Sequence, residues 1–293
     1  MESKTQLARD LGVSRSSLYY KRKKEVQDGA LREQIVDVMS SNPAYGYRRV
    51  ALALGINKKK AQRVMKKYGL KAYKRKARWR KRRDERRKEM PYPNLTKDRC
   101  PVMPGHTYVS DFTYVRYNSK FYYLATFMDR YTREIVGWNV SNRHTKDLVI
   151  GAFLDTFLNT GFQVPHIVHS DQGAEYCSQE YLGRVEGLGI KVSMAKKASP
   201  WENGYQESFY GNFKTDLGLE FERYPTSGAF VEGIDHTINY YNRERIHSSL
   251  KTSPYGFRKQ FQKLNLGLSK KWGSCYPDLC IQKEQMYNKY QWI

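Results

Sequence analysis

Cysteine is scarce in this chain, with four in 293 residues. So few cysteines in a long chain exclude a disulfide framework and are typical of a reducing compartment. Long uncharged hydrophobic runs are missing as well, so no segment is expected to span a membrane. The polar N-terminus has none of the apolar stretch that a secretory leader requires. We therefore expect a cytoplasmic protein.

Acidic residues are the minority in the charge balance. The chain carries 52 Lys and Arg against 29 Asp and Glu, a formal net charge of +23. The excess lies at one end, because residues 1–89 hold 28 basic and 9 acidic residues and Lys58–Glu89 alone holds 18 basic ones. Like charges at this density repel one another unless an anionic polymer offsets them, releasing counterions as it binds. Since aromatic residues are sparse in this arm, its charge favours double-stranded DNA over a single strand, a membrane surface or an acidic protein.

Two helical patterns in the basic arm predict tandem helix-turn-helix units. Residues 5–20 turn at Gly12, a residue free to adopt positive φ, and residues 31–69 contain an Asn-Pro break and an expected helix cap at Asn57. Small helical bundles without a DNA-binding role share these patterns, and the adjoining charge favours DNA. The expected DNA contacts in the arm are Arg15, Arg48, Arg49, Lys58, Lys59, Lys60, Arg63, Lys66, Lys67, Arg75, Arg78 and Arg82.

Beyond a cluster of prolines, the pattern changes from helical to strand-like. Residues 107–117 and 120–130 are rich in β-branched and aromatic residues, and Asn118-Ser119 between them predicts a tight hairpin. A third strand is expected at 134–142, followed by alternating helices and short strands. The expected helices cover 145–161, 202–217 and 227–242, and the short strands cover 166–172 and 191–196. This order predicts an α/β fold built on a mixed sheet.

Three carboxylates stand out in this second region. Asp111 interrupts an apolar and aromatic strand, where a charge is unfavourable unless a metal or an ion pair offsets it. Asp171 follows a short apolar strand, and the ends of strands in an α/β sheet border the crevice where ligands bind. Glu207 lies on an expected helix that carries Gly211 and Lys214 on the same face. Taken singly, each acid is also consistent with an ion pair or a solvated surface position.

The segments around these acids resemble those of a known family. "VSDFTYV", "VHSDQGAEY" and "QESFYGNFKTDL", with 35 residues between Asp171 and Glu207, are similar to the catalytic segments of bacterial insertion-sequence transposases encoded by the second reading frame, relatives of retroviral integrases. "YGYRRV" and "YNRERIHSSLKTSPYGF" are similar to its helix-turn-helix region and its C-terminal signature. The resemblance covers roughly residues 10–260. The chain departs from the family at Glu202-Asn203-Gly204, where Asp-Asn-Ala is usual, which affects the entry of the helix.

The resemblance implies a ribonuclease-H-like mixed sheet preceded by small all-α helix-turn-helix units. It also implies a catalytic, metal-binding set of Asp111, Asp171 and Glu207. Carboxylate oxygens suit Mg²⁺ or Mn²⁺, and we expect two ions with Asp111 as the bridging ligand. Lys214 is the candidate for positioning a DNA phosphate. His169, Asn203 and His247 are candidates for lining the site, although a buried structural histidine is equally consistent with His169 and a helix-capping role is the favoured reading of Asn203.

The expected division of the chain has four parts. Residues 1–70 form the helix-turn-helix region, 71–104 a basic linker, 105–260 the integrase-like catalytic domain, and 261–293 a tail of unknown role. The function expected is DNA transposition, in which the protein binds insertion-sequence ends and cleaves and transfers strands into target DNA. Expected partners are these DNAs, further copies of the chain, and a protein from an upstream frame, with the protein on the bacterial nucleoid. Two alternatives stay open: a DNA-binding regulator with an inactive integrase-like domain, and a related nuclease that cuts without joining.

Overall fold

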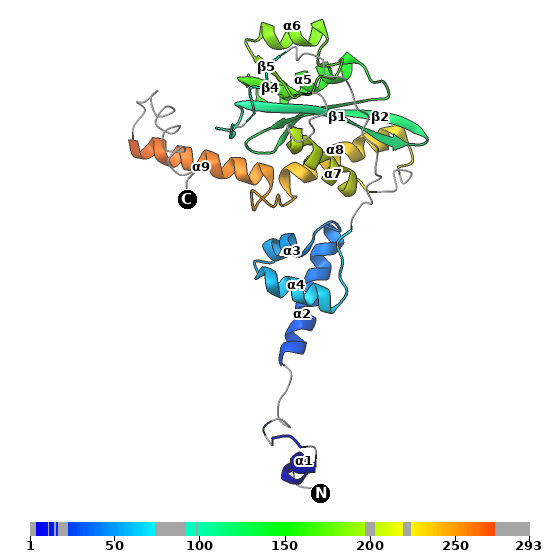
Figure 1. The fold of residues 1–293 in the computed structure, drawn as a ribbon, viewed down its shortest axis with the longest axis vertical. Coiled ribbons are helices and arrows are strands. Elements are labelled where there is room, and N and C mark those ends of the chain that lie inside the picture. The colour runs from blue at the N-terminus through cyan, green and yellow to red at the C-terminus, as the bar shows by residue number, and fades with distance from the viewer. Residues whose placement is uncertain are drawn as a thin grey trace. The chain divides into compact units, whose positions relative to one another are not determined.

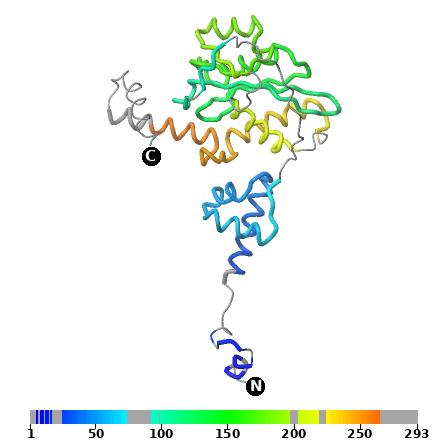
Figure 2. Tube along the Cα trace, in the orientation of Figure 1, coloured from blue at the N-terminus to red at the C-terminus, as the bar shows by residue number. Residues whose placement is uncertain are grey.

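The computed structural model describes residues 4–10, 12–14, 16, 23–73, 92–97, 99–196, 203–218 and 224–272. It divides into two compact units, residues 1–74 and 75–293, which we call the N-terminal and C-terminal units and which Figures 1 and 2 colour along the chain. None of the helices in the described ranges combines the length and apolar character that a bilayer span requires.

The N-terminal unit is built from short helices. Helix α1 spans Lys4–Asp10. Gly12, two residues after its end, has a φ of 62°, which confirms the predicted turn. The rest of the expected unit 5–20, including Arg15, lies outside the described residues apart from isolated positions. Helices α2 (Lys23–Ser41), α3 (Tyr47–Ala53) and α4 (Lys58–Lys67) pack around buried apolar side chains. These are Leu31, Ile35, Tyr45, Val50, Ala51, Ala61, Val64 and Met65.

Two local predictions for this unit are confirmed and one boundary is corrected. The side chain of Asn57 accepts a hydrogen bond of 2.8 Å from the backbone N–H of Lys59, so it caps α4. Asn42-Pro43 follows the end of α2. However, α2 begins at Lys23, eight residues before the apolar pattern from Leu31 indicated. The added turns are mostly polar and exposed, so hydrophobic periodicity did not mark them.

The C-terminal unit contains a five-stranded sheet in the order β3-β2-β1-β4-β5. Strands β1 (Thr107–Tyr117), β2 (Lys120–Asp129) and β3 (Ile135–Ser141) form an antiparallel meander. Strands β4 (Ile167–Ser170) and β5 (Lys191–Met194) add in parallel beyond β1. Asn118 and Ser119 both have positive φ, as the predicted tight hairpin requires. The arrangement is ribonuclease-H-like, which confirms the expected fold class.

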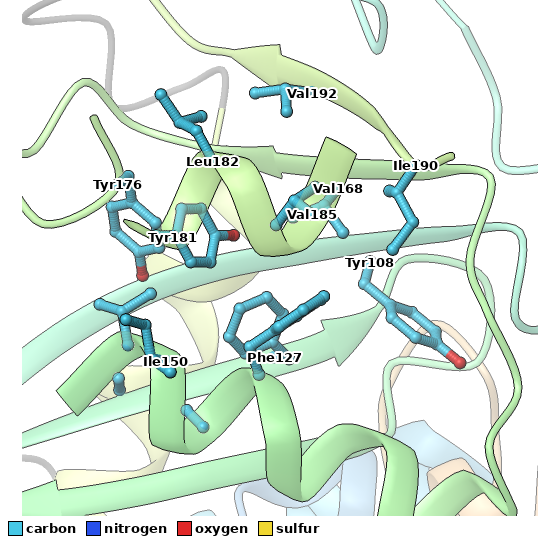
Figure 3. Packing of buried hydrophobic residues seen from close by; sticks show 14 of the residues in the cluster. Tyr108, Phe127, Ile150, Val168, Tyr176, Tyr181, Leu182, Val185, Ile190 and Val192 are labelled. Carbon is cyan, nitrogen blue, oxygen red and sulfur yellow. The ribbon is translucent and has the colours of Figure 1, made fainter. Parts of the chain in front are cut away.

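Helices cover both faces of the sheet (Figure 1). On one face, α5 (Lys146–Thr160) and α6 (Gln179–Gly187) pack against the sheet through a large apolar cluster (Figure 3). On the other, α7 (Gly204–Asp216) and α8 (Ser227–Arg243) bury a second cluster that includes Phe209, Phe213 and Phe230. Helix α9 (Pro254–Trp272) follows, and the expected boundary at residue 260 falls inside it.

Candidate active site

Asp111 lies on β1 where one edge of that strand opens. Strand β4 pairs with β1 only at residues 107–109, so from Ser110 onward this edge has no partner among the described strands. The Oδ1 atom of Asp111 accepts a hydrogen bond of 2.8 Å from the backbone N–H of Phe112. Burial raises the pKa of Asp111 to about 7, with further raising by the charges of Asp171 and Glu207. Ionisation of this carboxyl therefore costs free energy in the folded protein.

Asp171 directly follows β4, which is the neighbour of β1 in the sheet. Its Oδ1 accepts a hydrogen bond of 2.9 Å from the backbone N–H of Gly173. Burial is the main cause that raises the pKa of Asp171, and the charge of Glu175 adds to it. The parallel pairing of β1 with β4 brings the two aspartates near each other, and the charge of Asp171 raises the pKa of Asp111.

Glu207 and Lys214 come to the same place from α7. Glu207 is exposed near the start of the helix, and its charge contributes to the raised pKa of Asp111. Lys214 acts in the opposite direction and lowers that pKa. Between them, a side chain added at Gly211 would meet open space. Asp171, Glu207 and Lys214 are therefore each close enough to Asp111 for their charges to act on its carboxyl.

Helix α7 is hydrogen-bonded to β1 at the residues that lead up to Asp111. The side-chain amide of Asn203 donates to the carbonyl of Ser110 (3.2 Å), and that of Gln206 donates to the carbonyl of Val109 (2.7 Å). The hydroxyl of Tyr210 donates to the carbonyl of Asp111 itself (2.5 Å) and lies 2.9 Å from the hydroxyl of Thr126. These contacts fix the register of α7, and with it Glu207, against Asp111.

Two buried phenols lie close to the carboxylates. The hydroxyl of Tyr176 is 2.8 Å from that of Ser110, and Tyr210 contacts the carbonyl of Asp111. Burial raises the pKa of both phenols well above the usual value, and the charge of Asp111 raises it further. Both hydroxyls are therefore neutral and serve as hydrogen-bond partners.

His144 and Glu175 belong to this neighbourhood, and the sequence analysis missed them. The Nδ1 atom of His144 lies 3.1 Å from a carboxylate oxygen of Glu175. Its ring packs on Phe112, with centroids 4.3 Å apart, and its charge lowers the pKa of Asp171. Neither residue falls in a strand or at a distinctive helix position, so only the tertiary structure shows that they border Asp171.

The three sequence-predicted lining residues differ in where they lie. Asn203 is buried at the N-cap position of α7, yet its side chain makes no capping hydrogen bond and binds Ser110 instead, so the expected cap is wrong. His169 is fully buried, with Nδ1 2.9 Å from the hydroxyl of Ser193. His247 lies in a turn after α8, where its N–H donates to the carbonyl of Thr252. The side chain of Asn203 is thus bound to the strand that carries Asp111.

The C-terminal signature segment has a clear structural role. Arg245, directly after α8, is 1% exposed. Its guanidinium pairs with Asp216 at the end of α7 and donates a hydrogen bond of 2.9 Å to the side-chain oxygen of Asn212. Arg245 therefore links the C-terminal end of α8 to the part of α7 that carries Lys214.

The carboxylate set fits a divalent metal in its chemistry. Among the described residues, no three His, Cys, Asp or Glu side chains already stand close enough to hold an ion. However, hard carboxylate oxygens are the ligands that Mg²⁺ and Mn²⁺ prefer. Burial raises the pKa of Asp111 and of Asp171, which shows that the negative charge of each carboxylate is poorly compensated. A bound cation would offset these charges. Asp111, Asp171 and Glu207 are the residues that would hold it.

The basic residues expected to contact DNA fall into three groups. Lys58, Lys59 and Lys60 are exposed in the first turn of α4, and Arg48 and Lys66 are exposed on α3 and α4. Arg49 is partly buried and stacks on Tyr45, with its guanidinium carbon 5.6 Å from the ring centre. Arg63 and Lys67 both bind the buried carboxylate of Asp28, at 2.6 and 3.1 Å. Arg15, Arg75, Arg78 and Arg82 lie outside the described residues.

The C-terminal unit matches known proteins over its whole sheet. The family described as "Integrase core domain" matches residues 101–200, and a second family with the same description matches residues 188–254. Together the two matches cover more than half of the chain. The transposase for insertion sequence IS904 of Lactococcus lactis is 34% identical over 162 residues, which are 55% of this chain and 63% of that protein. The putative transposase InsK for IS150 of Escherichia coli is 29% identical over 87% of this chain and 93% of that protein.

A solved structure is also similar. The magnesium-bound catalytic core of HTLV-2 integrase is 20% identical, covers 54% of this chain and 98% of its own, and has a TM-score of 0.46.

A ribonuclease-H-like sheet covered by helices on both faces defines the fold class of this protein. Residues 101–254 belong to the integrase core domain family, and the chain is similar to transposases of bacterial insertion sequences. Its match spans less than two thirds of the IS904 transposase and nearly the whole of InsK.

Proposed function

We propose that this protein is an active DNA transposase that cleaves and transfers strands at Asp111, Asp171 and Glu207. The proximity of Asp171, Glu207 and Lys214 to Asp111 supports the proposal, because the charge of each of these residues acts on the carboxyl of Asp111. A related nuclease would use the same groups, so joining of strands, rather than cutting alone, is the diagnostic activity. Family membership supports this reading.

Asp111, Asp171 and Glu207 would hold Mg²⁺ or Mn²⁺, with two ions expected, and the bound metal would supply activation of the attacking oxygen and charge stabilisation of the leaving oxygen. The chain's own residues hold the reactants in place. Lys214 positions a DNA phosphate, and the hydrogen bonds from Asn203, Gln206 and Tyr210 keep Glu207 in register with Asp111. Each aspartate uses one oxygen for a backbone N–H, which fixes the orientation of its carboxylate.

The N-terminal unit supplies DNA binding in this proposal. Three lysines in the first turn of α4 oppose the positive end of the helix dipole, with no acidic residue there to offset them. DNA phosphates would relieve that repulsion.

The division proposed is residues 1–70 for DNA recognition, 71–104 as a basic linker and 105–260 for catalysis. Insertion-sequence ends and target DNA are the substrates, in the bacterial cytoplasm at the nucleoid, and pairing two ends requires further copies of the chain. A protein from an upstream frame is a further proposed partner.

Asp171→Asn tests the proposal with little change of shape, because the asparagine side-chain oxygen can still accept the hydrogen bond from Gly173. Labelled insertion-sequence ends are incubated with each protein in Mg²⁺, Mn²⁺ or EDTA. We expect metal-dependent nicked and joined strands from the wild type, none from the variant, and equal DNA binding by both.

Other results would point elsewhere. DNA binding without cleavage in any metal would favour the regulator with an inactive catalytic domain. Cleavage without joined products would favour the nuclease. If Asp171→Asn loses DNA binding together with activity, Asp171 has a structural role and the assigned site is wrong.

A further inference from the structure

One face of the β1–β2 hairpin carries a strip of aromatic side chains that reaches Glu175 at one end, through His144, and Lys214 at the other. We define this aromatic strip as Phe112, Tyr114, Phe121, Tyr123 and His144. In the antiparallel register Tyr114 lies opposite Tyr123, so both point to the same face, as does Phe112 two residues earlier. Ring centroids are 4.3 Å apart for Phe112 and His144, 4.9 Å for Tyr123 and His144, and 5.6 Å for Tyr114 and Phe121.

The strip runs from the neighbourhood of Asp171 to solvent. At its inner end, His144 packs on Phe112 and lowers the pKa of Asp171, whereas the side chain of Asp111, one residue before Phe112, points to the opposite face of the strand. At its outer end, Tyr114 is 41% and Phe121 49% exposed. Large aromatic side chains are rarely left this accessible in a group beside a reactive site unless they contact a ligand.

Positive charges border the outer end of the strip. The ammonium of Lys214 lies 5.0 Å from the centre of the Tyr114 ring. Arg116 lies opposite Phe121 in the register, on the same face, and both Arg116 and Lys120 are exposed. Aromatic faces with cations beside them are the composition that binds single-stranded nucleic acid, in which bases stack and phosphates meet the charges.

We propose that the aromatic strip stacks unpaired nucleobases adjacent to the phosphate on which the carboxylates act. The inference rests on the proposed function and deepens it. A phosphate held by Lys214 is one sugar away from its own base, which places that base at the Tyr114 ring. Phe112 and Tyr114 are about 7 Å apart along the strand, enough for two stacked positions. Paired bases hide their faces within the duplex, so the strip favours DNA whose terminal pairs have opened.

The test measures binding rather than chemistry. The full-length Asp171→Asn protein, without metal, is titrated with duplexes whose terminal base pairs are either matched or mismatched, with 2-aminopurine at the end. We expect tighter binding and stronger fluorescence quenching for the mismatched end. Tyr114→Ala and Phe121→Ala should each weaken that binding about tenfold and leave the matched duplex unchanged. Tyr114→Phe should bind both duplexes as the wild type does, because its ring still stacks.

Phe162→Ala is the matched control, since Phe162 is 72% exposed on the same unit and lies outside the strip. Placing 2-aminopurine in the insertion-sequence end or in the target strand identifies which DNA supplies the bases. Equal affinity of Tyr114→Ala and wild type for mismatched ends would overturn the proposal, as would equal losses for matched and mismatched DNA. A change in self-association in place of DNA affinity would assign the strip to a protein contact and also overturn it.

The strip and the proposed function fail separately. If strands are joined by the wild type and equally by the strip variants, the transposase stands and the strip does not. If no metal supports cleavage while mismatched ends still bind through Tyr114, the strip stands and the proposed activity does not.

Discussion

The surroundings of Asp111 disfavour its ionised form, because burial and the nearby acids raise its pKa from 3.8 to about 7. A carboxyl with a higher pKa in the folded chain destabilises the fold wherever it is ionised. That penalty is absent below the unfolded value, grows between the two values, and is complete above the folded one.

The first prediction follows for Asp111→Asn in EDTA. We expect this variant to melt at a higher temperature than wild type at about pH 8, with the difference vanishing near about pH 4. Thermal unfolding across pH measures it, and a lower melting temperature for the variant at about pH 8 would contradict the assigned burial and repulsion. Its strand-transfer activity should nevertheless be lost.

A second prediction concerns metal affinity at the same residue. The metal binds the ionised carboxylate, so binding must release the proton that Asp111 holds below about pH 7. We therefore expect the Mn²⁺ affinity of the wild type to weaken as the pH falls from about 7 to 5. Calorimetry in buffers of different ionisation enthalpy measures the released proton, and a pH-independent affinity would show that Asp111 is not a ligand.

Among the elements, α7 determines the geometry of the site. Tyr210→Phe removes one hydroxyl and leaves the Asp111 carbonyl and Thr126 without that partner, at a cost of about 1–3 kcal/mol. We expect strand-transfer activity to fall about tenfold or more while DNA affinity is kept. Ser208→Ala, at an exposed position of the same helix, is the control. Unchanged turnover of Tyr210→Phe would show that the register of α7 depends on its other contacts.

The buried pair at the far end of α7 gives a prediction about stability. Arg245→Ala leaves Asp216 without its cation in a buried position, which should cost about 3–5 kcal/mol. Arg245→Lys should not restore stability, because one ammonium cannot reproduce the fork that binds both Asp216 and Asn212. Urea unfolding measures both variants, with exposed Glu244→Ala as control. A loss well under about 1 kcal/mol for Arg245→Ala would sink this assignment.

Sequence patterns predicted the elements better than their connections. The hairpin at Asn118-Ser119, the helix cap at Asn57 and the alternation of helices and strands all depend on local chemistry, and the structure confirms them. The contacts that hold α7 on β1 join residues more than ninety positions apart. No local periodicity marks such pairs, so the sequence patterns did not single out Gln206 or Tyr210.

For the candidate site, family spacing pointed to three acids, and the charges of Asp171 and Glu207 act on Asp111. Of the two readings that the sequence left open for His169, the buried structural one is confirmed. His169 lies on the right strand and is enclosed in the sheet, whereas His144, from a loop, borders Asp171. The direction of a loop side chain depends on tertiary packing, which the sequence alone does not reveal.

For the whole molecule, the uneven charge predicts how DNA binding responds to salt. Exposed Lys58, Lys59 and Lys60 should contact phosphates, so replacing all three with Gln should reduce the salt dependence by about 0.9 per lost contact. Arg63→Gln is expected to act differently, destabilising the N-terminal unit, because Arg63 binds buried Asp28. Binding of end DNA by the full chain at several salt concentrations, with thermal unfolding, separates the two. Equal salt slopes for the lysine variant and wild type would refute the contact.

The distance along the chain between β1 and α7 also matters while the protein is being made. The carbonyls of Val109, Ser110 and Asp111 receive their donors from residues 93 to 99 positions downstream. At about 5–20 residues per second, the ribosome needs several seconds to supply them. During that interval the nascent chain already has its basic arm and Asp111, but no Glu207. If the proposed function holds, synthesis itself delays strand cleavage until the DNA-binding unit has been made.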